Sequence, residues 1–178
     1  MFYIEIMAIV AMVAMLVGIA TINLVPKALR SRFDQQAQEF INTLKMAHNA
    51  ASQSDRRYAV LLDLDEGTYT LQPFVALDAD AIPVTEETII TGRFTEDFRL
   101  DYVRFDDGKD TRYVETNAVE VYRVWLLASQ SGWQNSIQIG VLDREDNPYT
   151  IVVNRLSGVI TMYEGEYQIP EPVDNVLF

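Results

Sequence analysis

The chain has 178 residues, a formal net charge of −12 and no cysteine. This length suits one domain of ordinary size plus an additional segment, and the lack of cysteine excludes disulfide frameworks and thiol chemistry. Residues 1–54 hold four basic and three acidic residues, whereas residues 55–178 hold ten basic and twenty-three acidic ones. Such an acidic C-terminal part argues against binding to nucleic acid, because phosphate recognition requires clustered Lys and Arg.

The first 26 residues are strongly apolar, and the stretch from residue 6 to residue 20 has no polar side chain. About 20 apolar helical residues cross a hydrocarbon core of about 30 Å, so residues 1–26 are predicted to form a transmembrane helix. A cleavable signal peptide would need a basic region before the apolar run, but the first basic residue is Lys27. The basic residues after the span would place the acidic part in the cytoplasm, unless a short basic leader preceded Met1 and was removed.

Glu5 is a carboxylate at the beginning of this apolar run. A charged side chain in an apolar layer costs a few kcal/mol unless a partner neutralises it. One candidate partner is the α-amine of Met1, from the same chain or from a neighbour. In a bundle of such helices, this pair would set the axial register between subunits. Alternatively, Glu5 lies in headgroup water near a helix N-terminus that favours anions, and the local sequence leaves both interpretations open.

The segment IEIMAIVAMVAMLVGIA, which begins at Ile4, resembles the class III signal segment of type IV pilins and type II secretion pseudopilins. In that family a prepilin peptidase cleaves before the first mature residue, which is usually Phe and corresponds here to Met1. The family glutamate stands at the fifth mature position, as Glu5 does. The resemblance implies that Met1 is methylated and that Glu5 recruits each subunit into a helical filament. It also implies a structural subunit that is not an enzyme.

The same resemblance implies the partners and the location of the protein. The partners would be copies of this chain or other pilins, the prepilin peptidase and an inner-membrane assembly platform powered by a separate ATPase. The chain would lie in the inner membrane of a bacterium before assembly, and in a periplasmic or extracellular filament afterwards. No cofactor is expected, and nucleic acid is not an expected partner.

Gly18 and Pro26 predict a weak point in the helix. Glycine lowers helix stability, and proline removes an intrahelical hydrogen bond. In assembled pilins, a stretch between such residues is commonly unwound, so the resemblance implies local melting within residues 16–26 in a packed filament. A modest kink at Pro26 is the alternative.

Residues 27–54 are predicted to continue the helix with one apolar face. Apolar residues recur there at alternating spacings of four and three, which indicates a stripe that is buried against the rest of the chain. The stripe consists of Phe33, Ala37, Phe40, Leu44, Ala47 and Ala51. The helix is expected to end within residues 52–55. The single histidine, His48, is expected to be partly packed on the helix surface, because one histidine does not make a metal site.

From Arg57 onward the apolar period changes to two, which predicts β-strands. The expected strands are 56–64, 68–75, 98–105, one around Tyr113, 119–127, 136–142, 149–156 and 158–165. Turns are expected at 65–67, 106–110, 143–148 and 157–158. Without βαβ alternation, the fold class is α+β, with a long N-terminal helix packed on antiparallel β-sheets of a globular head. The parts are residues 1–26, residues 27–54, and a head at 55–178 that ends in a C-terminal arm.

Several short motifs resemble those of H-class minor pseudopilins and related minor pilins. The helix of that group ends in spaced Leu and Ala residues, followed by a hairpin and later by a terminal strand pair. The corresponding residues here are Leu44, Ala47 and Ala51, then Val60, Leu62, Asp65, Gly67 and Tyr69, then Ile151, Val153, Gly158 and Ile160.

Catalytic motifs such as G-x-S-x-G, the P-loop and H-E-x-x-H are absent from the sequence. The acidic clusters fall where turns are expected, and none has the spacing of an EF-hand loop. Asp106, Asp107 and Asp110 are the candidates for a calcium site, and a structural turn is the alternative. Trp133 is a candidate for an exposed ligand-binding side chain, although aromatic residues on strands more commonly pack in the core.

Two functions of different classes remain from the sequence. The first is a filament subunit that assembles through its N-terminal helix, with Glu5 setting the register. The second is a membrane-tethered β-domain that binds a ligand or a secreted protein without polymerising. A simple tether would tolerate Glu5→Ala, whereas a filament subunit would lose assembly. The sequence leaves open whether such a subunit is major or minor, and whether its filament serves secretion, adhesion, motility or DNA uptake.

Overall fold

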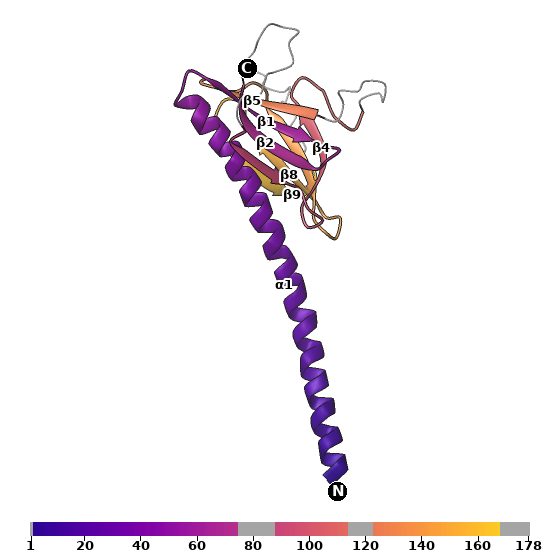
Figure 1. The fold of residues 1–178 in the computed structure, drawn as a ribbon. Helices are drawn as coiled ribbons and strands as arrows, with labels where there is room; N and C mark the ends of the chain where they lie inside the picture. Colours follow the sequence, from indigo (N-terminus) through magenta and orange to yellow (C-terminus); the bar gives the residue numbers. More distant parts are fainter. Residues whose placement is uncertain (1, 75–87, 114–122, 168–178) are drawn as a thin grey trace, which may run out of the picture.

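One long helix leads into a β-rich head in the computed structural model, which describes residues 2–74, 88–113 and 123–167 (Figure 1). The side chains of residues 2 and 19–28 are outside this description. Helix α1 spans Phe2–Ser52, a length of 51 residues. It ends where the sequence predicts, at the polar residues that follow the last apolar position of the stripe. Its C-terminal half lies along the head, and its N-terminal half projects away from the head.

The described part of the head consists of two antiparallel sheets, which confirms the predicted α+β class. The strands are β1 (Arg57–Asp63), β2 (Thr68–Phe74), β3 (Ile90–Arg93), β4 (Arg99–Phe105), β5 (Arg123–Ser129), β6 (Gly132–Trp133), β7 (Ile137–Leu142), β8 (Pro148–Val153) and β9 (Ile160–Glu164). The first sheet has the order β3-β2-β1-β5-β6, and the second has the order β4-β7-β8-β9.

Two sequence-predicted features of the strands are present in detail. Strands β1 and β2 form a hairpin that pairs Asp63 with Thr68. In its turn, Asp63 Oδ1 accepts hydrogen bonds from the backbone N–H groups of Asp65 (3.1 Å) and Glu66 (2.9 Å). Strands β7, β8 and β9 form the predicted meander of consecutive antiparallel neighbours. Both features are local, so the turn chemistry and the two-residue period specify them.

The strand predicted around Tyr113 is absent from residues 111–113, and residues 114–122 lie outside the described residues. After β4 the chain makes a single bridge between Arg104 and Asp110 and then turns, with the N–H of Tyr113 donating to the carbonyl of Asp110 (3.1 Å). The Asp110 side chain also accepts the N–H of Arg112, which favours a turn over a strand. The partner of β4 is instead β7, which comes later in the chain.

The sequence analysis also missed two short strands, β3 and β6. Strand β3 lies within a segment rich in turn formers, and β6 has two residues, so neither carries a readable apolar period. The predicted strand at 119–127 corresponds to β5, and residues 119–122 lie outside the described residues. Most of the expected C-terminal arm, residues 168–178, lies outside them as well.

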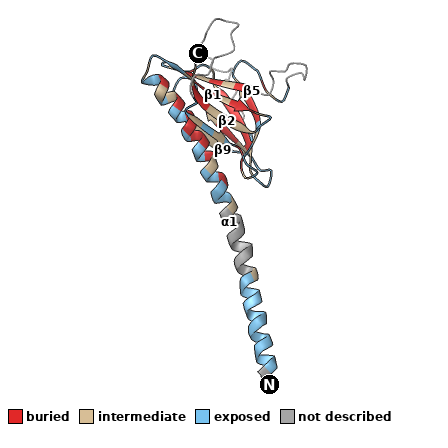
Figure 2. Cartoon of the chain, viewed as in Figure 1, coloured by how far each residue is buried: buried red, intermediate tan, exposed pale blue. Residues whose placement is uncertain are grey.

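The apolar stripe of α1 lies in the core, and all six of its residues are buried. Phe40 is central: its ring centre lies 5.0 Å from that of Tyr69 and 5.3 Å from that of Phe94. Further toward the N-terminus, the ring of Phe33 lies 4.4 Å from that of Tyr149, at the start of β8. Figure 2 shows the buried face of the helix against the sheets. The stripe therefore joins α1 to both sheets.

We predict that Phe40→Ala lowers the free energy of unfolding of the head by about 3–5 kcal/mol, because it leaves a cavity among packed aromatic rings. Denaturant unfolding of the full chain in detergent, followed by tryptophan fluorescence, measures this loss. Met46→Ala is the matched control on the same helix, since Met46 is 46% exposed and its truncation should change stability by less than about 0.5 kcal/mol. Equal effects of the two variants would contradict the central position of Phe40.

Candidate assembly surface

The projecting half of α1 exposes an apolar surface on all sides. Every residue from Tyr3 to Val17 is exposed, and these residues include eleven large hydrophobic side chains, from Ile6 at 45% to Tyr3 at 84%. Figure 2 shows this exposed half beyond the head. Contiguous apolar surface of this size is rare on soluble monomers and marks a surface that another molecule or a membrane covers.

Glu5 is the one acidic residue in the first turn of α1, and it is exposed. A carboxylate is favourable there, because the unpaired N–H groups at a helix N-terminus carry a partial positive charge. Met1 lies outside the described residues, so the pairing of Glu5 with its α-amine stays a prediction. What the structure does show, within residues 3–17, is one exposed carboxylate among exposed and mainly apolar side chains.

Helix α1 is continuous across Gly18 and Pro26 in the single chain. The predicted melting within residues 16–26 concerns a packed filament, so it stays a prediction. The transmembrane assignment of residues 1–26 is also a prediction. In the part of the chain that the structure describes, no helical stretch meets the combined length and hydropathy of a membrane span.

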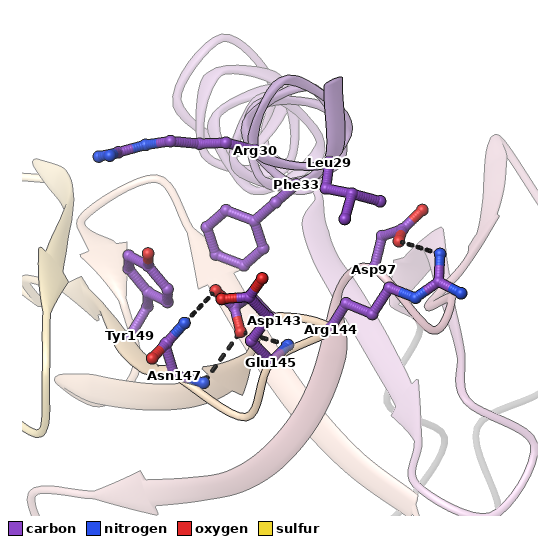
Figure 3. A pocket seen from close by; sticks show the side chains of 9 residues that line it. All are labelled: Leu29, Arg30, Phe33, Asp97, Asp143, Arg144, Glu145, Asn147 and Tyr149. Carbon is purple, nitrogen blue, oxygen red and sulfur yellow. Dashed lines mark hydrogen bonds and ion pairs between the residues drawn. The ribbon is translucent and has the colours of Figure 1, made fainter. Parts of the chain in front are cut away.

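A pocket of about 200 Å³ lies where the projecting half of the helix meets the head (Figure 3). One wall is the helix, with Leu29, Arg30 and Phe33, and the other is the turn between β7 and β8. Arg30 reaches Glu164 of β9 at 3.2 Å. On the other side of the pocket, Arg144 pairs with Asp97 at 3.7 Å. The buried Phe33 ring against Tyr149 and the exposed Arg30–Glu164 pair connect the helix to the second sheet where the helix leaves the head.

The turn beside this pocket is held by Asp143. Its carboxylate accepts the backbone N–H groups of Glu145 (2.8 Å) and Asn147 (2.9 Å) and the side-chain amide of Asn147 (2.8 Å). Burial raises the pKa of Asp143, but these hydrogen bonds outweigh that effect and hold the pKa below its usual value. The carboxylate therefore serves the turn rather than a ligand.

The calcium candidates have separate protein partners. Asp106 accepts hydrogen bonds from Asn135 and from the backbone of Ser136, both at 3.0 Å, and Asp107 pairs with Lys109 at 3.0 Å. The described residues hold no group of three or more acidic or histidine side chains arranged for a metal ion. The alternative interpretation, a structural turn, accounts for the contacts of these three residues.

Asp110 is the centre of an ion-pair network that the sequence analysis missed. Its Oδ2 atom accepts hydrogen bonds from Arg104 and Arg112, each at 2.9 Å, and both arginines also reach Glu166 at 3.4 Å. The Arg112 guanidinium lies 4.0 Å from the ring centre of Tyr102. In the sequence, the only indication of this network is that Arg104 and Arg112 flank Asp110. That spacing does not identify Glu166, which is distant in the chain, as a further partner.

Trp133, the candidate exposed aromatic, is 2% exposed. Its ring lies 6.4 Å from that of His48 and nearly parallel to it. His48 is partly buried, as expected from its place on the helix. Core packing, the commoner role of a strand aromatic, therefore accounts for Trp133.

Comparisons with known proteins yield little. No protein-family model matches the chain, and no curated protein sequence matches it. Among solved structures, the chain is similar to the minor pseudopilin EpsH from the type II secretion system of Vibrio cholerae. The two are 15% identical with a TM-score of 0.48, and the match covers 74% of this chain and 95% of EpsH. A similarity of this size does not assign the chain to a family.

The Asp110 network predicts a specific acid sensitivity. Burial raises the pKa of Asp110, but the hydrogen bonds from Arg112 and Arg104 outweigh it and lower the pKa to about 2. Because an unfolded Asp titrates near pH 3.9, the stabilisation is complete at pH values above about 5 and is lost as the pH falls toward 2. We predict that Asp110→Asn lowers the free energy of unfolding by about 2 kcal/mol at pH 7 and flattens its pH dependence between about pH 4 and 2.

Denaturant unfolding at a series of pH values measures this effect. The matched control is Asp107→Asn, which removes an exposed carboxylate from the same turn and should cause a much smaller loss. Parallel pH profiles for the wild type and Asp110→Asn would contradict the assignment.

Proposed function

We propose that this chain is a structural subunit of a type IV pilus-like or type II secretion pseudopilus filament. It assembles through the N-terminal half of α1, and Glu5 sets the register between subunits. The observation that carries the proposal is the exposed apolar half of α1 with a single carboxylate at its tip, continuous with a half that is built into the head. In this proposal the single helix α1 connects the apolar core of the filament to the acidic head on its surface.

Burial of the projecting half makes release of a subunit from the filament into water unfavourable. Each of its large apolar side chains contributes about 1.5–3 kcal/mol when it moves from water to an apolar environment. In the proposed pathway the helix first lies in the inner membrane and then moves into the filament core. Lipid tails and neighbouring helices are similarly apolar, so this second step changes apolar burial little. A paired charge can then decide which register is adopted, because an unpaired Glu5 in that core is costly.

The acidic head fits the outer surface of such a filament. Its net negative charge keeps it soluble, while the helices meet along the axis. The proposed partners are copies of this chain or other pilins, together with a prepilin peptidase and an assembly platform at the inner membrane. The proposed final location is a periplasmic or extracellular filament, and the chain itself carries out no catalysis in this proposal.

We predict that Glu5→Gln reduces the yield of sheared filaments at least about tenfold, because loss of one charge pair removes register without altering helix length or apolar surface. Electron microscopy and quantification of sheared material from cells that express the full chain measure this yield. Glu145→Gln is the matched control, since it removes one exposed head carboxylate and should leave the yield unchanged.

The result separates the two candidate functions. Uniform thin filaments of the wild-type chain that disappear in Glu5→Gln support the filament subunit. If the wild type stays in the membrane as monomers, the filament proposal fails and the tethered binding module takes its place. If Glu5→Gln assembles normally, the chain is a filament subunit whose register does not depend on Glu5.

A further inference from the structure

A hollow of about 390 Å³ lies at the end of the head opposite the projecting helix. It is formed by the start of β1, the β5–β6 hairpin and the turn between β8 and β9. Leu127, Trp133 and the 85%-exposed Leu156 supply apolar lining, and Arg57 and Arg155 supply positive charge. The indole Nε1 of Trp133 is buried without a hydrogen-bond partner among the described residues. The lining therefore combines apolar surface with positive charge.

Backbone geometry at Gly132 shapes this hollow. Gly132 has a φ of 116°, a backbone conformation that residues other than glycine rarely adopt. A Cβ atom there would lie 2.5 Å from the carbonyl oxygen of Arg155. The glycine therefore lets the β5–β6 hairpin close against the β8–β9 turn, which brings the two basic segments to one site.

Arg57 and Arg155 differ from most arginines of this acidic chain. Across residues 2–74, 88–113 and 123–167, neither takes part in an ion pair with a carboxylate. The arginines that do so are Arg30, Arg32, Arg99, Arg104, Arg112, Arg123 and Arg144. Two guanidinium groups at a hollow, with no carboxylate partner among the described residues, favour the binding of carboxylates.

Exposed carboxylates, whose charge is opposite to that of Arg57 and Arg155, lie just beyond the other end of β1. That strand runs from Arg57 to Asp63 and leads directly into the turn that bears Asp65 and Glu66. At about 3.3 Å per residue, the strand separates the two ends by roughly 20 Å. The Asp63 carboxylate is occupied by the turn N–H groups and by Arg123 at 3.1 Å. Asp65 and Glu66 are exposed, and neither is ion-paired with a described residue.

We propose that the Arg57–Arg155 hollow of one copy binds the Asp65–Glu66 turn of a second copy. In a filament whose helices run parallel, the hollow of one head meets the turn of the next, so the contact is heterologous and can repeat as an open series. The inference rests on the proposed filament, whose helical stacking such a contact would reinforce outside the helix core. We expect the contact to weaken with added salt, because the screening length between exposed charges shortens to about 3 Å at 1 M salt.

A charge-reversal experiment in the full chain tests the contact. Arg57→Glu combined with Arg155→Glu should lower the filament yield about tenfold or more, because like charges then face each other. Adding Asp65→Arg and Glu66→Arg to the same chain should restore the yield to within about twofold of wild type, because the complementary charges are exchanged. Adding Glu145→Arg instead, which reverses a carboxylate on a different turn, should not restore it.

Cysteine cross-linking provides a second readout that keeps both arginines. The natural chain has no cysteine, so Ser131→Cys with Asp65→Cys introduces the only two thiols. Ser131 is exposed at the hollow, and Glu66 stays in place to bind there. Oxidation should give a ladder of cross-linked multimers that weakens at 1 M salt. The matched pair Ser131→Cys with Glu145→Cys should give no ladder.

The outcomes distinguish the two proposals. A normal filament yield after the arginine reversal, no recovery in the quadruple variant, or no ladder from the Asp65 pair would each overturn the head-to-head contact. If Glu5→Gln still abolishes filaments in those cases, the proposed function stands although the contact between heads does not. Lack of recovery after a real loss would mean that the hollow takes a different partner. A ladder on membranes from cells without filaments would support the contact while the filament proposal fails.

Discussion

The structure depends on one constraint: a single helix packs into the core of the head with one half and exposes an apolar surface with the other half. Its C-terminal half buries one stripe against two sheets, with Phe40 among the aromatic rings of Tyr69, Phe94 and Phe98. In its N-terminal half, residues 3–17 are exposed and apolar apart from Glu5, and the described part of the head does not cover them. Because α1 is continuous, packing in the head fixes the direction in which the exposed half is presented. The proposed assembly follows from that continuity.

Charge is distributed so that it supports this arrangement. Most described arginines are paired with carboxylates and hold turns or segments in place, as Arg104 and Arg112 do around Asp110. At the base of the projecting half, Arg30 and Arg144 fasten the helix and the β7–β8 turn to neighbouring elements. Individually such exposed pairs contribute little. Arg57 and Arg155 line a hollow and have no carboxylate partner among the described residues, so they are available to another molecule.

The sequence motifs predict a helix followed by a small β-rich head, and the structure has this architecture. The functional proposal rests on residues of this chain. Glu5 and the apolar surface around it support a filament core, whereas the ends of β1 support a contact between heads. These are separate surfaces on one molecule, and a variant of one leaves the other unchanged.

The sequence by itself determined the features that depend on neighbouring residues: the long helix, its buried stripe, the β1–β2 hairpin and the β7–β9 meander. Periodicity and turn chemistry act over a few residues, so they can be recognised without the fold. Only the tertiary structure decided that β1 pairs with β5 and β4 with β7, since those partners are distant in the chain. It also buried Trp133, replaced the expected strand at Tyr113 with a turn, and brought Arg57 and Arg155 together. Pairing between distant segments depends on the packing of the whole core, which no local pattern encodes.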